Sequence, residues 1–113
     1  MDNSILNDIA KAHRIVVKVG TSTLTYDTGK MNLQRIDQLA RVLSDLENQG
    51  KEVILVSSGA QGIAMGKLGL KEKPKEMRQK QAIAAIGQCE LMYLYDKFFS
   101  GYNNTIAQIL LTK

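Results

Sequence analysis

The stretch RIVVKVGTSTLT, residues 14–25, is an apolar strand that runs into a glycine and several hydroxyl-bearing residues. The β-branched residues at 15–19 predict a buried strand, although Lys18 stands inside it. A lysine near a strand end is more often structural, with its stem along apolar surface and its ammonium in water. The sharper alternative is that Lys18 belongs to an anion site, and the rest of the chain bears on this choice.

A helix and a second strand are expected after this stretch. Residues 20–30 are rich in Thr, Ser, Asp and Gly and predict a loop. Apolar residues then recur at helical spacing over 32–50, between a candidate N-cap at Asn32 and a candidate stop at Gly50. The run at 52–57 is apolar without alternation, which is typical of a parallel strand covered on both faces.

The second half of the sequence continues the alternation. A glycine-rich segment becomes helical after Ala60, and a long helix is expected from about 76 to 99, with two apolar strips that indicate burial on more than one side. Within it, Gly87 lets another backbone approach closely, either the sheet or a second subunit. Residues 105–112 predict a third strand. Two successive β-helix-β crossovers predict an α/β fold, a parallel sheet with helices on both faces, incomplete in this chain because three strands make a thin sheet.

Composition narrows the function classes. The chain has 113 residues, enough for one domain, and a net charge of +4 that suits anionic ligands. A single Cys89 and a single His13 leave no set for a disulfide or a Cys/His metal site. Residues 1–13 form a polar leader without signal-peptide character, and no apolar run is long enough for a membrane, so we expect a cytoplasmic protein. The basic segment 67–80 contains no aromatic residue, which argues against a nucleic-acid partner.

The loop after the first strand has the composition of a phosphate cradle. Gly20 permits a tight turn and removes the Cβ that would keep a ligand from the backbone. The N–H groups of Gly20, Thr21 and Ser22 can then converge on an anion, and Lys18 lies two residues upstream on the strand. The pattern is neither GxxxxGK[ST] nor GxGxxG, so neither a Walker loop nor a dinucleotide fingerprint is present.

The second strand ends in a similar way, at Ser58, Gly59 and Ala60. The helix that follows presents its N-terminal N–H groups and dipole, which favour a carboxylate or a phosphate. The alternative is a plain helix cap, in which Ser57 or Ser58 satisfies the first-turn N–H groups. Because ligands of open α/β sheets bind beyond the carboxyl ends of the strands, we expect the two loops to line one cleft.

The order of four motifs, KVGTS, SSGA, AIGQ and QILLT, resembles the front part of the amino acid kinase family. The resemblance covers nearly all of residues 14–113 and implies a three-layer sandwich, of which residues 1–113 would form the N-terminal, substrate-side part. It implies an enzyme of the branch that transfers the γ-phosphoryl group of ATP to the side-chain carboxylate of L-glutamate, the first step toward proline.

The resemblance also implies roles for individual residues. Lys18 would contact the transferred phosphoryl group, and the N–H groups of Gly20, Thr21 and Ser22 would hold the phosphates of ATP. Ser58, within Ser58-Gly59-Ala60, would contact the glutamate substrate. Mg²⁺ is expected to be bound by phosphates and water, with no protein metal ligand in this chain.

Two alternatives stay open at this point. One is a non-catalytic α/β module that binds anions or regulates without transferring a phosphoryl group, and the other is a different member of the same family. The glycine- and alanine-bearing helix makes a homo-oligomer the expected assembly. The remaining members of the family's active site have no counterpart in these residues, so the 113-residue chain alone is expected to be inactive.

Overall fold

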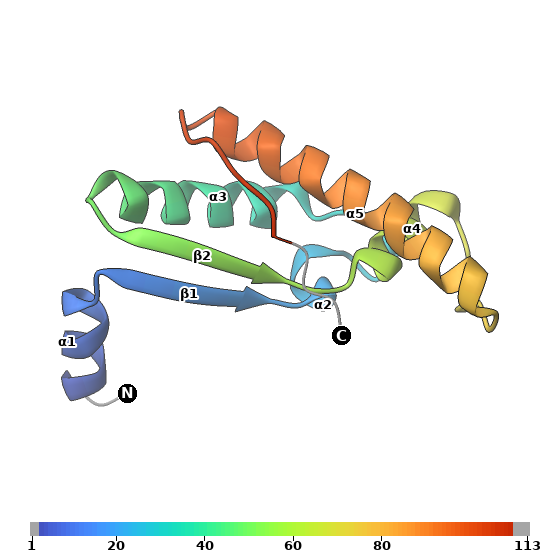
Figure 1. Cartoon of the computed structure of the whole chain (residues 1–113), viewed down its shortest axis with the longest axis horizontal. Helices are drawn as coiled ribbons and strands as arrows, with labels where there is room; N and C mark the ends of the chain where they lie inside the picture. Colours follow the sequence, from blue (N-terminus) through green and yellow to red (C-terminus); the bar gives the residue numbers. More distant parts are fainter. Residues whose placement is uncertain (1–2, 110–113) are drawn as a thin grey trace.

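The computed structural model of the protein describes residues 3–109 and is built around two parallel strands (Figure 1). Strand β1 pairs with β2 in a register that runs from Arg14 opposite Glu52 to Val19 opposite Ser57. The predicted α/β class and the parallel order are therefore confirmed. The elements are, in chain order, α1 Asn3–Lys11, β1 Arg14–Val19, α2 Thr21–Leu24, α3 Leu33–Asn48, β2 Glu52–Ser57, α4 Ala60–Leu68 and α5 Met77–Ser100.

The core lies between the sheet and two helices. Figure 1 shows α3 and α5 on the same side of β1 and β2, with α1 beside the start of β1 and away from them. Both strands alternate between half-buried and exposed residues, so within residues 3–109 the helices cover only one face of the sheet. The main buried residues of the core are Val19, Leu24, Ile36, Ala40, Leu43, Ile63, Leu91, Tyr95 and Phe99.

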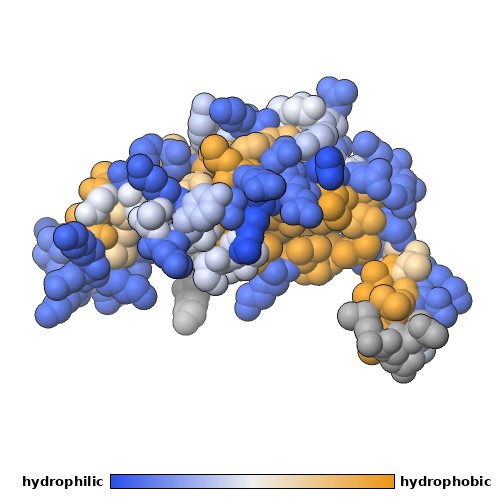
Figure 2. All heavy atoms as spheres, turned by 180° about the vertical axis from the view of Figure 1, so that it is seen from behind, coloured by the Kyte–Doolittle hydropathy of each residue, from blue (hydrophilic) through white to orange (hydrophobic). Residues whose placement is uncertain are grey.

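The opposite face of the sheet is left open by residues 3–109. Val16 is 61% exposed and Ile54 is 46% exposed, which corrects the expectation that residues 52–57 form a strand covered on both faces. Seen from behind, hydrophobic side chains reach the surface in the middle of the molecule (Figure 2). The continuous apolar run at 52–57 thus reflects two faces that are both apolar, of which this part of the chain covers one.

Local signals at the ends of α3 agree with the structure. The Asn32 side chain accepts a hydrogen bond from the Arg35 backbone N–H at 3.2 Å, as expected of an N-cap. Gly50 follows the helix with a φ of 95°, which favours glycine. The sequence therefore predicted both ends of this helix correctly to within two residues.

The polar leader contains a helix. Residues 3–11 form α1. The Lys51 ammonium donates to the carbonyl oxygens of Ala10 and Ala12 at 2.9 and 2.7 Å, next to the C-terminal end of this helix. A cation there satisfies late carbonyls and complements the helix dipole. The lysine is about 40 residues away in sequence, so no local pattern reveals this contact.

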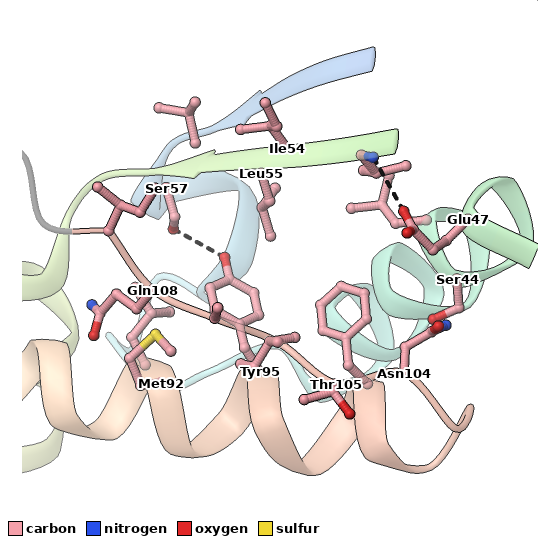
Figure 3. Close-up of a pocket in the computed structure, with 18 of the residues that line it drawn as sticks. Ser44, Glu47, Ile54, Leu55, Ser57, Met92, Tyr95, Asn104, Thr105 and Gln108 are labelled. Carbon is pink, nitrogen blue, oxygen red and sulfur yellow. Dashed lines mark hydrogen bonds between the residues drawn. The ribbon is translucent and has the colours of Figure 1, made fainter. Parts of the chain in front are cut away.

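The described part of the third predicted strand does not belong to the sheet. Residues 105–109 have no regular structure, and residues 110–112 of the predicted strand lie outside the described part of the chain. The segment instead lines one side of a groove of about 650 Å³ between β2 and α5 (Figure 3). At the free edge of β2, the Glu47 carboxylate accepts from the Val53 N–H at 3.2 Å, and this takes up one donor that an added strand would need.

Two further expectations need correction. The loop at 20–30 contains a single helical turn, α2, because backbone hydrogen bonds close on Gly20 immediately after the strand. On α5, one strip is buried, but Ala82, Ala85 and Cys89 of the second strip are exposed, so the described residues bury this helix on one side only.

Among residues 3–109, no helix is both long and apolar enough to cross a membrane.

Candidate functional site

The two loops singled out in the sequence begin side by side at one end of the sheet. Val19 is opposite Ser57 in the strand register, and the Ser58 N–H donates to the Val19 carbonyl oxygen at 3.3 Å. Helices α2 and α4 start directly after the two strands, at the arrowheads in Figure 1. The parallel pairing therefore brings together the backbone of both predicted anion loops.

The first loop is anchored to the core by its helical turn, and its backbone is uncrowded at Gly20. The Thr23 N–H donates to the Gly20 carbonyl at 3.2 Å, and the Leu24 side chain anchors the turn in the core with 1% of its surface exposed. Gly20 itself has an extended backbone, with φ −94° and ψ 168°, and a Cβ added there would meet no atom within 4 Å. Among the described residues, neither backbone strain nor crowding requires glycine at this position.

Lys18 occupies the penultimate position of β1, on the open face of the sheet. Its side chain is exposed, and it forms no hydrogen bond or ion pair with any residue that the structure describes. An ammonium that is not committed to a carboxylate remains available to an anionic ligand. The structure therefore places Lys18 next to the first loop without assigning it a structural partner.

The second loop turns through a left-handed glycine. Gly59 has φ 88° and ψ 21°, a conformation that favours glycine, and it is the N-cap residue of α4. Glycine supplies no side-chain acceptor to the first turn of that helix. Ser57, one of the two serines considered as a cap, instead shares a hydrogen bond of 2.9 Å with the Tyr95 hydroxyl (Figure 3). Ser58 follows it with an exposed side chain.

Two glycine contacts fix α4 in place. A Cβ on Gly87 of α5 would overlap the carbonyl oxygen of Ala60 and lie 3.2 Å from its Cα. A Cβ on Gly66 of α4 would overlap the carbonyl oxygen of Gly29, in the turn that precedes α3. The backbone that approaches Gly87 therefore belongs to the start of α4 in the same chain, not to the sheet or to a second subunit.

Two side chains that connect α5 to β2 and to α4 have shifted pKa values. Burial raises the pKa of the Tyr95 hydroxyl, and its hydrogen bond with Ser57 partly opposes this. On the surface, the Lys67 ammonium donates a hydrogen bond to the Glu90 carboxylate, which raises the pKa of Lys67, and the two side chains form an ion pair of 2.5 Å between α4 and α5. No group of three or more His, Cys, Asp or Glu side chains within residues 3–109 is arranged to hold a metal ion.

Sequence reasoning missed several residues that shape this region. Tyr95 was not singled out, although its hydroxyl reaches the last residue of β2. A tyrosine four residues after Leu91, on the buried strip of a helix, is a signal that its hydroxyl needs an internal partner. Gly29 and Gly66 carried no readable signal, because the partner of each glycine is distant in sequence.

Comparison with known proteins agrees with this architecture. Residues 13–113 match the Amino acid kinase family. Glutamate 5-kinase of Clostridium perfringens is 62% identical over 100 residues, which are 88% of this chain and 37% of that protein. The glutamate 5-kinases of Moorella thermoacetica and Enterococcus faecalis are 56% and 55% identical over 93% and 95% of this chain, and over 28% and 40% of their own lengths.

The chain thus spans well under half the length of the curated relatives it matches. The family match nevertheless includes both strands, both candidate loops and the long helix that packs against them. With a parallel α/β sheet whose strand ends carry these loops, and with a match over nearly all of its residues, the chain belongs to the amino acid kinase family.

Proposed function

We propose that this chain forms the N-terminal, substrate-side part of a kinase that transfers the γ-phosphoryl group of ATP to the side-chain carboxylate of L-glutamate. The observation that carries the proposal is the junction of the two loops at one sheet end, where the Ser58 N–H meets the Val19 carbonyl. Relatives 55–62% identical to this chain are named glutamate 5-kinases, which supports this substrate over those of other amino acid kinases.

In this proposal the chain aligns two anions and offsets their repulsion. Phosphoryl transfer asks little covalent chemistry of a protein and depends on positioning and on stabilising spread negative charge. The backbone N–H groups of Gly20, Thr21 and Ser22 hold the phosphates of ATP, and the Lys18 ammonium contacts the phosphoryl group being transferred. The loop Ser58–Ala60 receives the glutamate.

The same proposal includes Mg²⁺ as a companion of the nucleotide. The acidic residues within 3–109 form no ligand set for a resident ion. Magnesium bound to ATP keeps several waters and uses phosphate oxygens as ligands. When bound, it would neutralise part of the phosphate charge that faces Lys18.

The test removes the ammonium of Lys18 in the full-length enzyme. Lys18→Met keeps the length of the side chain and takes away its charge, so kcat for ATP-dependent glutamate phosphorylation is expected to fall by about 10²–10³-fold, as for other single donors to a transition state. The melting temperature is expected to stay unchanged, since Lys18 has no ion-pair or hydrogen-bond partner among the described residues. Lys71→Met, at another exposed lysine, is the matched control. Near-normal turnover of Lys18→Met would refute the role given to this residue.

A further inference from the structure

We propose that α5 sets the position of the loop Ser58–Ala60, and that Tyr95 and Gly87 are positioning residues for the substrate bound there. This inference rests on the proposed function of that loop. Neither residue lies in the loop, and both act on it from a buried strip of the long helix. The inference follows from three contacts, one at Ser57 just before the loop and two within the loop at Ser58 and Ala60.

The first contact is the hydrogen bond between Tyr95 and Ser57. The two hydroxyl oxygens are 2.9 Å apart, and Tyr95 is 6% exposed. Its ring packs against that of Phe99, with centroids 6.2 Å apart and ring planes tilted by 52°. The aromatic ring therefore has little freedom, and its hydroxyl holds the residue immediately before Ser58 against α5, as Figure 3 shows.

The second contact is the approach of Gly87 to Ala60. Only a hydrogen atom on the Gly87 Cα fits beside the Ala60 carbonyl group. The start of α4 thus rests directly on the backbone of α5. This contact determines where the first-turn N–H groups of α4 lie, and these groups would face the substrate carboxylate.

The third contact joins the loop to the other anion site. The Ser58 N–H donates to the Val19 carbonyl, one residue before Gly20. Residues 57, 58 and 60 are therefore each tied to a different place, and Gly59 between them has the left-handed conformation that the turn needs. The distance between the two loops depends on α5, because α5 supplies two of these three contacts.

The experiment compares two tyrosine variants of the full-length enzyme. Tyr95→Phe removes only the hydroxyl that holds Ser57, and the expected result is a KM for glutamate about fivefold higher, the worth of one ordinary hydrogen bond, with the KM for ATP unchanged. Tyr93→Phe is the matched control, because Tyr93 is on the same helix but 60% exposed, and it is expected to behave as the wild type.

A second pair of variants tests the backbone contact. Gly87→Ala forces α4 away from α5, and a displacement of about 1 Å at a substrate site can lower kcat/KM by about 10²-fold, here measured for glutamate. Gly101→Ala, at the end of the same helix with φ −61°, is the control and is expected to have little effect. Should Gly87→Ala fail to fold, Tyr95→Phe still decides the question.

The outcomes separate this inference from the proposed function. A rise in the glutamate KM without a change in the ATP KM supports the positioning role. If the wild type is active and Tyr95→Phe has an unchanged KM for glutamate, or equal rises in the KM values for glutamate and ATP, the inference is overturned. The proposed function then remains intact. A wild-type enzyme without glutamate-dependent ATP turnover overturns both.

Discussion

Replacing Gly66 by alanine tests whether α4 packs against the turn at Gly29. The substitution has two opposing effects on the stability of the protein. Glycine costs a helix up to about 1 kcal/mol relative to alanine, so helix propensity alone predicts that Gly66→Ala stabilises the protein. In the structure, however, the new methyl group would overlap the carbonyl oxygen of Gly29 and lie 2.7 Å from its carbonyl carbon. Overpacking of this kind costs about 1–3 kcal/mol.

The upper part of that range applies to Gly66 because its neighbour cannot yield easily. Gly29 is in a tight turn closed by hydrogen bonds of 2.9 Å between Tyr26 and Lys30 and from the Gly29 N–H to the Tyr26 carbonyl. Its φ of 84° also restricts how the turn can move. Subtracting the gain in helix propensity leaves a net destabilisation of about 2 kcal/mol.

The assay is thermal unfolding of the full-length enzyme at a fixed protein concentration. A loss of about 2 kcal/mol lowers the melting temperature by roughly 4–8 °C for a chain of moderate size. Gly101→Ala serves as the control, since the nearest atom to its new Cβ is the Phe98 carbonyl oxygen at 3.3 Å. A higher melting temperature in Gly66→Ala would refute the reasoning, because it would mean that α4 and the turn at Gly29 do not touch.

Three further predictions concern stability and activity. Asn32→Ala is expected to lower the free energy of unfolding by about 1 kcal/mol, because the N–H of Arg35 loses its acceptor, while Asn32→Asp retains the cap; urea unfolding distinguishes them. Because burial raises the pKa of Tyr95 in the folded state above its ordinary value of 10.0, its contribution to stability is complete below pH 10 and is lost as the pH rises toward the folded pKa. Unfolding at increasing pH is therefore expected to show a smaller alkaline loss for Tyr95→Phe than for the wild type, and equal losses would contradict this. The isolated 113-residue chain is expected to show no ATP-dependent formation of glutamyl phosphate, and detection of that product would overturn this prediction.

Much of the fold could be predicted because the deciding signals are local. The run at 52–57 has the bounds of β2 in the structure, and helical spacing together with Asn32 and Gly50 locates α3. Hydrophobic periodicity and helix caps depend on neighbours within about one turn, so they can be read from the sequence. The parallel order then follows from the helical crossover between the two strands.

The predictions that failed depended on partners distant in sequence. Residues 105–109 have the composition of a strand but are not paired, and the Glu47 carboxylate takes a donor at the edge they would use. Helix α1 is supported by Lys51, the residue just before β2, which lies at the same end of the sheet but about 40 residues away in sequence. Strand composition and helix propensity give a segment's preference, and only its tertiary neighbours determine whether that preference is satisfied.

The features of the candidate site also differ in whether they could be predicted from the sequence. The sequence established which chemical groups are available, namely a lysine before a glycine in KVGTS and a second glycine loop in SSGA. It also determined that both loops follow parallel strands and so begin at one end of the sheet. These features are properties of residue type and order.

The contacts that hold the second loop depend on tertiary packing. Ser57 faces Tyr95 and not the first turn of α4, and Gly87 receives the backbone of Ala60 and not that of the sheet or another subunit. The physical reason is that a close backbone approach and a buried hydrogen bond each need two partners, here about 27 and 38 residues apart, that come together only when the helices pack. The open face beside Lys18 is likewise a product of packing, because both faces of β2 carry apolar residues and the described helices cover only one of them.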